Sequence, residues 1–212
     1  MIVDERMVSF INSLDAGNPS YLNELEEYAR ETDVPIVRTE MQSFLRFLMK
    51  MKRPVRILEV GTAIGFSALL MSEYAPKGCK ITTIEKYEKR IPLAIENFKK
   101  AGKEEDITLL QGDALEILPT LQEEYDFIFM DAAKGQYTDY YLPVKKLVKT
   151  GGVLMSDNVL FKGMVANESI VQKNKRGIVN DLMDFNKMLS EDKDFDTSFI
   201  PMGDGVAISI KK

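Results

Sequence analysis

Acidic and amide side chains follow two apolar stretches of this chain, each at the point where a β-strand is expected to end. Asp131 comes after one stretch, and Asp157 and Asn158 come directly after the next. Two carboxylates and an amide form a set of hard oxygen ligands of the kind that Mg²⁺ prefers. Lys134, three residues past Asp131, is close enough to serve the same centre. The spacing therefore predicts a metal-assisted reaction site with a lysine beside it.

The chain contains no histidine. This excludes an imidazole base, a histidine triad and a histidine-bound metal, so a general base must be lysine, aspartate, glutamate or tyrosine. A metal must then bind among oxygens, which favours Mg²⁺, Mn²⁺ or Ca²⁺ over Zn²⁺.

A second pattern lies upstream, where an apolar, β-prone run leads into a glycine turn and then an apolar helix. The run contains Glu59, and Gly61 and Gly65 bracket the turn. Glycine lets the backbone approach a ligand closely. An acidic residue at this point suits a cationic ligand rather than a phosphate. Glu85 ends the next apolar run, at the position where doubly wound α/β folds place an acidic residue that hydrogen-bonds a ribose.

Each of these features has a plainer interpretation. A single aspartate after a strand is often a helix cap, Lys134 alone would be a solvated charge, and Asn158 tolerates a left-handed turn.

A dinucleotide fold and a nicotinamide oxidoreductase are disfavoured, because the G-x-G-x-x-G positions hold Gly61, Ala63 and Phe66. The coincidence of complementary groups at several strand ends favours a functional site.

The elements that would position these residues alternate between strand and helix after an N-terminal helical region. Thr39 to Gln42 reads as a capping box that opens the third of three N-terminal helices. Strands are expected at 55–60, 80–85, 107–111, 125–130 and 152–156, helices at about 64–75, 87–101, 114–121, 137–149 and 178–190, and a closing hairpin at 195–200 and 206–210. This order predicts an α/β fold: a doubly wound, mostly parallel seven-stranded sheet with an antiparallel terminal hairpin. We expect a single domain over residues 1–212, with helices in 1–50 and the α/β core in 55–212.

The composition is typical of a soluble intracellular protein. The 212 residues are 45% hydrophobic, the formal net charge is −5, and Cys79 is the single cysteine, which excludes a disulfide framework. The first residues lack the pattern of a signal peptide, and no apolar run is long enough for a membrane helix. We therefore expect a cytoplasmic location and no membrane partner.

The motifs in combination resemble the cation-dependent O-methyltransferase family, which includes the catechol and caffeoyl-CoA enzymes. They are ILEVGTAIGFS at residues 57–67, Gly112-Asp113-Ala114, the D-x-x-K of Asp131 to Lys134, and Asp157-Asn158. The resemblance covers nearly the whole chain, from residues 35–42 to residues 203–206. It is closest to a bacterial branch that methylates 5-hydroxyuridine in tRNA to 5-methoxyuridine.

The resemblance implies S-adenosylmethionine (SAM) as methyl donor, a Rossmann-like methyltransferase fold and a homodimer. Glu59, Gly61 and Ser67 would surround the methionine part of SAM, and Glu85 would hold its ribose. The other implied donor contacts are Asp113 and Ala114 at the adenine, backbone near Ile36 at the amino-acid end, and Asp131. The implied metal ligands are Asp131, Asp157 and Asn158, for Mg²⁺ or another hard dication, and the implied catalytic residues are Lys134 and Asp131.

The methyl acceptor is open on chemical grounds, because a catechol and a 5-hydroxyuridine both offer two adjacent oxygens. The segment between Phe161 and Gly177 contains four basic residues and one acidic residue, so its local charge is +3 on a protein whose net charge is −5. Such a segment suits a phosphate-bearing substrate, or it is an ordinary solvated loop. We favour tRNA as the methyl acceptor, with a small catechol-like phenol as the alternative. A different class of function, a non-catalytic nucleotide-binding module, is a further alternative. Acyl-CoA substrates are disfavoured, since the plant enzymes' recognition insertions have no equivalent here.

Overall fold

The computed structural model describes residues 3–212, which pack into two compact units. One unit comprises residues 6–114, and the other comprises residues 115–212 together with residues 3–5. The expectation that the chain is a single domain stays a prediction.

In the first unit, three N-terminal helices precede three strands that alternate with two further helices. The elements are α1 (Glu5–Ser13), α2 (Ser20–Glu31), α3 (Thr39–Lys52), β1 (Arg56–Val60), α4 (Phe66–Tyr74), β2 (Lys80–Glu85), α5 (Ile91–Lys100) and β3 (Ile107–Gln111). The strand β2 pairs in parallel with β1 on one side and with β3 on the other. Helix α4 packs against α2 and α3, and its first six residues are buried.

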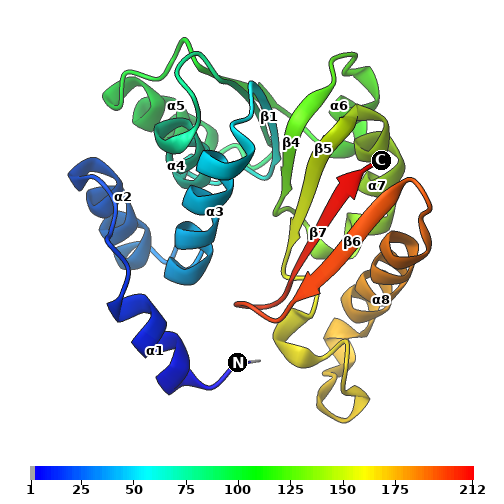
Figure 1. Cartoon of the computed structure of the whole chain (residues 1–212). Helices are drawn as coiled ribbons and strands as arrows, with labels where there is room; N and C mark the ends of the chain where they lie inside the picture. Colours follow the sequence, from blue (N-terminus) through cyan, green and yellow to red (C-terminus); the bar gives the residue numbers. More distant parts are fainter. Residues whose placement is uncertain (1–2) are drawn as a thin grey trace. The chain divides into compact units, whose positions relative to one another are not determined.

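The second unit begins within the short helix α6, whose first residue still belongs to the first unit, and it ends in a hairpin, drawn in orange and red in Figure 1. Its elements are α6 (Ala114–Ile117), β4 (Tyr125–Met130), α7 (Tyr137–Leu147), β5 (Val148–Asp157), α8 (Arg176–Glu191), β6 (Phe195–Ile200) and β7 (Val206–Lys211), with single turns of 3₁₀ helix at 118–120, 134–136, 161–163, 168–170 and 173–175. The strands β4 and β5 are parallel, and β7 is antiparallel to both β5 and β6. Helix α8 packs against α7 and β6.

All seven strands belong to one sheet, in which the order runs β3-β2-β1 through the first unit and β4-β5-β7-β6 through the second. The predicted α/β fold with an antiparallel terminal hairpin is confirmed. Four strands, β2, β3, β4 and β6, have the predicted bounds. They are easily located because each apolar, β-prone run is flanked by polar or turn-forming residues.

The strand β5 is longer than predicted and begins at Val148 rather than at residue 152. The structure places the pair Gly151-Gly152 inside the strand, where the β4–β5 register shifts between Tyr125 and Phe127. A Cβ at Gly152 would lie 2.6 Å from the carbonyl oxygen of Lys149 and 3.0 Å from that of Tyr125. Glycine is therefore required at an irregularity within β5, because a side chain would strike the backbone.

The predicted capping box at the start of α3 is wrong in detail. The N-cap residue is Arg38, with no side-chain cap hydrogen bond. The amide of Gln42 instead donates to the Val37 carbonyl oxygen at 3.0 Å and accepts from the Asn18 amide at 2.6 Å. Contacts with the preceding segments replace the local cap, which the sequence pattern alone does not reveal.

Within residues 3–212, none of the helices has both the length and the apolar composition needed to cross a membrane.

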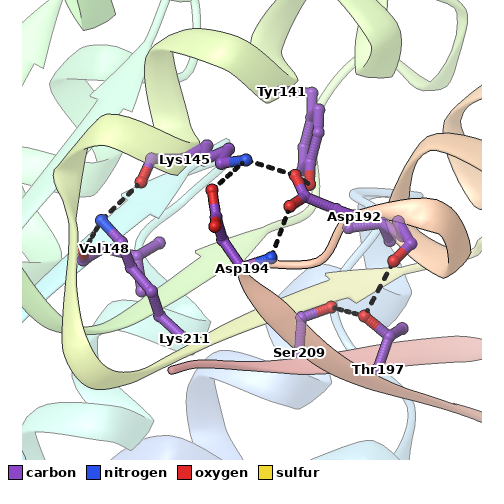
Figure 2. Close-up of polar contacts among 9 residues, drawn as sticks. Tyr141, Lys145, Val148, Asp192, Asp194, Thr197, Ser209 and Lys211 are labelled. Atoms are coloured by element: carbon purple, nitrogen blue, oxygen red, sulfur yellow. Dashed lines mark hydrogen bonds and ion pairs between the residues drawn. The ribbon is translucent and has the colours of Figure 1, made fainter.

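A group of ion pairs and hydrogen bonds joins the ends of α7 and α8 to the hairpin (Figure 2). The ammonium of Lys145 lies 2.5 Å from the Asp192 carboxylate and 2.7 Å from that of Asp194. The hydroxyl of Tyr141 donates to Asp192 at 2.6 Å, and Lys211 donates to the carbonyl oxygens of Lys145 and Val148. Asp192 therefore links two helices that flank the sheet.

Replacing Asp192 with asparagine is expected to lower the free energy of unfolding by about 1–3 kcal/mol, because partly buried charge-assisted hydrogen bonds are lost. Burial acts to raise the pKa of Asp192, but hydrogen bonds from Lys145 and Tyr141 together hold it below its ordinary value. A lowered folded-state pKa means that this stabilisation is present above about pH 4 and is lost as the pH falls through the folded-state pKa. Denaturant unfolding should therefore show a large difference from wild type at pH 7 that shrinks in acid.

The matched control is Asp196→Asn, which breaks an exposed ion pair with Lys212. Exposed pairs contribute about 0–1 kcal/mol. An Asp192→Asn protein as stable as this control at pH 7 would contradict a structural role for Asp192.

Candidate active site

The turn between β1 and α4 has an unusual backbone that other segments hold in place. Gly61, Ala63 and Gly65 have positive φ angles of 105°, 49° and 87°. A Cβ at Gly65 would lie 2.4 Å from the ring of Phe98. The amide nitrogen of Gly61 donates to the Ile84 carbonyl oxygen at 3.1 Å. The turn therefore depends on glycine for both conformation and space.

Glu59 lies beneath this turn and is completely buried. One of its carboxylate oxygens accepts a hydrogen bond from the Ser67 hydroxyl, and the other accepts one from the Thr83 hydroxyl, both at 2.5 Å. The hydroxyl of Thr83 also lies 2.5 Å from that of Thr62. A buried carboxylate needs such donors to remain charged. The structure thus joins the predicted residues Glu59 and Ser67 through a set of hydroxyls.

Glu85 is the last residue of β2, and its carboxylate hydrogen-bonds to the same turn. Its two carboxylate oxygens accept hydrogen bonds from the backbone nitrogens of Ala63 and Tyr87, each at 2.8 Å. The backbone nitrogen of Gly112 donates to the Glu85 carbonyl oxygen at 2.9 Å, which brings the end of β3 beside the end of β2. Asp113 follows there and accepts a hydrogen bond from Lys86 at 3.1 Å. We call Glu59, Gly61, Ser67, Glu85 and Asp113 the glycine-turn cluster.

Two other predicted donor contacts, Ala114 and Ile36, lie outside the glycine-turn cluster. Ala114 is buried and begins α6. Ile36 is half-buried in the segment between α2 and α3. Their contacts with a methyl donor stay predictions.

A second group of charged residues gathers in residues 115–212. Asp131 follows β4, and its carboxylate lies 3.3 Å from the ammonium of Lys134. Asp157 ends β5 and accepts a hydrogen bond at 2.7 Å from the backbone nitrogen of Asn158. We call Asp131, Lys134, Asp157 and Asn158 the acidic cluster.

The electrostatics of this cluster centre on Asp157, which is buried. Burial raises the pKa of Asp157 well above its ordinary value, and the negative charge of Asp131 raises it further, while the Asn158 amide and the Lys134 ammonium oppose the shift. Asp204, in the hairpin between β6 and β7, also raises it. The cluster therefore holds more negative charge around Asp157 than Lys134 offsets.

This excess of negative charge fits a divalent cation. The donors are carboxylate and amide oxygens, which hard cations such as Mg²⁺, Mn²⁺ and Ca²⁺ bind. A cation would supply the countercharge that a buried carboxylate otherwise lacks. Across residues 3–212 no three acidic or cysteine side chains converge on a single point, so the fit depends on Asn158 joining the two carboxylates.

The plainer interpretations of these residues can now be compared with the structure. Asp131 does not cap a helix: the first backbone nitrogen of α7, that of Tyr137, donates to Asp181 at 3.0 Å. Lys134 is partly buried and paired with Asp131 rather than a freely solvated charge. Asn158 does have the left-handed backbone of a turn residue, with a φ of 61°.

Comparison with known proteins identifies the family of this chain. A model of the family described as O-methyltransferase matches residues 12–212. The chain belongs to the O-methyltransferase family. The predicted resemblance to this family is thus confirmed, but the predicted likeness to its tRNA-methylating branch is not shown. The interpretations as a nicotinamide oxidoreductase or a non-catalytic module are disfavoured.

The family's relatives match most of this chain. A caffeoyl-CoA O-methyltransferase of Populus kitakamiensis is 37% identical over 172 residues, covering 78% of this chain and 73% of that protein. A catechol O-methyltransferase of Niastella koreensis is 32% identical over 219 residues, covering 99% and 91%. The crystal structure of the Podospora anserina methyltransferase PaMTH1 bound to S-adenosylhomocysteine (SAH) has a TM-score of 0.89 at 30% identity, covering 98% of this chain and 94% of that one.

Three polar residues of these clusters escaped prediction from the sequence. Thr83 supports Glu59, Asp204 adds charge near Asp157, and the Asn97 amide donates to the Ile64 carbonyl oxygen at 2.8 Å, inside the glycine turn. The one available signal was the Gly203-Asp204-Gly205 tripeptide, which appeared only as part of the family resemblance. Thr83 and Asn97 lie on elements whose faces are set by tertiary packing.

Proposed function

We propose that this chain transfers a methyl group from SAM to one hydroxyl of a small catechol-like phenol, with the help of a divalent cation. The observation that carries the proposal is the buried Asp157 carboxylate, with Asp131, Lys134 and Asn158, at the ends of two adjacent parallel strands. Family membership supports methyl transfer, and the names of the Populus and Niastella relatives support a phenolic acceptor.

The glycine-turn cluster would bind the donor. Glu59 and Ser67 would face the methionine part of SAM, whose sulfonium and ammonium groups are cationic, and Glu85 would accept hydrogen bonds from the ribose hydroxyls. Asp113 and Ala114 would border the adenine. The positive φ angles at Gly61 and Gly65 support this assignment, because they let the backbone approach a ligand closely.

The acidic cluster would bind the acceptor. Asp131, Asp157 and Asn158 would hold the cation, which when bound orients two adjacent substrate oxygens and makes the hydroxyl more acidic. Lys134 would act on the substrate hydroxyl in one of two ways. As an amine, its Nζ would accept the hydroxyl proton, and as an ammonium it would stabilise the oxyanion that remains. The oxygen–methyl bond then forms as the sulfur–methyl bond breaks, with the bonding pair returning to sulfur to leave SAH.

The preference for tRNA is not supported by the relatives, whose names refer to small phenolic acceptors and CoA esters. Within the basic segment 161–176, Arg176 pairs with Glu168 at 2.9 Å, so the +3 charge of the segment comes from its three lysines. The Niastella catechol enzyme matches nearly the full length of both chains, which favours a free catechol over a larger substrate.

Three further expectations stay predictions: Mg²⁺ as the cation, a cytoplasmic location and a homodimer. For the homodimer, the support is the exposed apolar face of α1, which includes Met7, Phe10 and Ile11, since α1 has no buried residue in this single chain. Sedimentation analysis would test the dimer directly.

The substrate class can be tested with isomers. The protein is incubated with SAM and Mg²⁺, and products are identified by mass spectrometry. Catechol should be methylated, whereas resorcinol and hydroquinone, which have the same atoms but no adjacent oxygens, should not. EDTA should abolish the reaction. Methylation of a tRNA containing 5-hydroxyuridine, with catechol untouched, would overturn the proposed acceptor, and equal rates on all three isomers would overturn chelation.

The donor assignment makes a separate prediction at Thr83. Thr83→Val keeps the shape of the side chain but leaves one oxygen of the buried Glu59 carboxylate without its hydroxyl donor. We expect SAM affinity to fall about tenfold, which corresponds to about 1.4 kcal/mol and to one hydrogen bond to a charged group. Calorimetric titration with SAM provides the measurement.

The control for this change is Thr82→Val, one residue earlier on β2 and so on the opposite face of the strand. This variant should bind SAM as wild type does. A Thr83→Val protein with reduced melting temperature but unchanged SAM affinity would assign Thr83 to folding alone.

A further inference from the structure

Tyr137 opens α7, and its side chain is completely buried. Its hydroxyl oxygen lies 3.2 Å from the carbonyl oxygen of Met130 and 3.0 Å from that of Asp157. The two carbonyls belong to the last residues of β4 and β5. A tyrosine hydroxyl has one proton to donate, so this one group is shared between the ends of two strands.

The hydroxyl continues the contact between these strands past their own pairing. The β4–β5 register ends at Met130 and Ser156. Asp157 pairs on its other side with Val206 of β7, while the chain leaves β4 at Asp131. The Tyr137 hydroxyl therefore links the backbones of β4 and β5 at their ends, beside Asp131 and Asp157.

Tyr137 is itself held firmly by α8. Its ring packs edge-to-face on Phe185, with ring centres 5.2 Å apart. Its backbone nitrogen donates to Asp181 at 3.0 Å, and Asp181 also accepts a hydrogen bond from the hydroxyl of Thr138. A side chain fixed at both its ring and its backbone can transmit a defined position to the groups that it bonds.

We propose that Tyr137 is a positioning residue for the metal site: its hydroxyl sets the separation of Asp131 and Asp157 by bridging the carbonyls of Met130 and Asp157. This inference rests on the proposed function and deepens it, since it explains how two ligands from different strands reach a common cation. Residues that orient metal ligands typically change metal affinity about 10- to 100-fold when they are replaced.

The test is Tyr137→Phe in the full chain, which removes the hydroxyl oxygen and leaves the ring. Mn²⁺ binding is measured by calorimetry and by the electron paramagnetic resonance of free Mn²⁺. We expect the Kd for Mn²⁺ to rise about tenfold or more, while the Kd for SAM stays at the wild-type value. Turnover lost at low Mn²⁺ should return when Mn²⁺ is raised, which a merely misfolded protein would not show.

The matched control is Tyr141→Phe, four residues along the same helix. Tyr141 is also buried, its ring packs edge-to-face on Phe185 at 5.9 Å, and its hydroxyl donates to Asp192. Both variants lose one buried hydroxyl and should melt earlier than wild type, but only Tyr137→Phe should weaken Mn²⁺ binding.

The possible failures are distinguishable. A wild-type protein that binds no Mn²⁺ would overturn the proposed metal site itself. Wild-type binding with an unchanged Kd in Tyr137→Phe, or an equal rise in both tyrosine variants, would overturn the positioning role alone. Should Tyr137→Phe not fold, Asp181→Ala removes the carboxylate that anchors the Tyr137 backbone, and it should weaken Mn²⁺ binding in the same direction; an unchanged Kd there would also overturn the role.

Discussion

Turnover should fall by about 100- to 10,000-fold when Lys134 is replaced with alanine, the range that general acid–base groups contribute. The ammonium of Lys134 lies 3.3 Å from Asp131 in the acidic cluster, where it is placed to serve the substrate hydroxyl. SAM affinity should be unchanged, because the glycine-turn cluster that would bind the donor does not include Lys134. Initial rates with catechol and calorimetric titration with SAM measure the two quantities separately.

Lys149→Ala is the matched control, since Lys149 also pairs with an aspartate, Asp126 at 3.4 Å, but is mostly exposed. It should retain wild-type rates. Equal losses of turnover and SAM affinity in Lys134→Ala would contradict a role confined to the acceptor. A wild-type rate would remove Lys134 from the mechanism.

Replacing Asp157 with asparagine should have two effects of opposite sign. Binding of Mg²⁺ or Mn²⁺ should weaken by about 100-fold or more, and turnover with it, because a buried carboxylate ligand becomes a neutral amide. The metal-free protein should become more stable by about 1–3 kcal/mol, since burial and the neighbouring carboxylates of Asp131 and Asp204 all disfavour the charge. Metal titration and melting in EDTA measure these effects.

The control here is Asp184→Asn, an exposed aspartate on α8 in the same unit, which should change neither quantity. A gain in stability alone, with full metal affinity and turnover, would show that Asp157 is buried for a reason unrelated to a cation. A loss of both stability and activity would indicate that Asp157 holds the fold together.

Much of the fold was predictable, because its signals are local. The strands β2, β3, β4 and β6 have the predicted bounds, since β-prone runs flanked by polar or turn-forming residues indicate strands without reference to the rest of the chain. Two exceptions are β5, which begins before its internal glycine pair, and the start of α3, where Gln42 contacts Asn18 instead of capping the helix. In both cases a partner distant in the sequence decided the local structure.

The candidate site divides in the same way. Residue types and positions near strand ends predicted the acidic cluster and most of the glycine-turn cluster, because parallel strands deliver their carboxyl ends to one edge of a sheet. Ser67 was implied only by the family resemblance. Only the tertiary structure shows that hydroxyls surround Glu59, that Asp204 adds to the charge around Asp157, and that Tyr137 bridges β4 and β5. These contacts join residues 7 to 47 positions apart, so they depend on strand register and helix packing, which set where each side chain points.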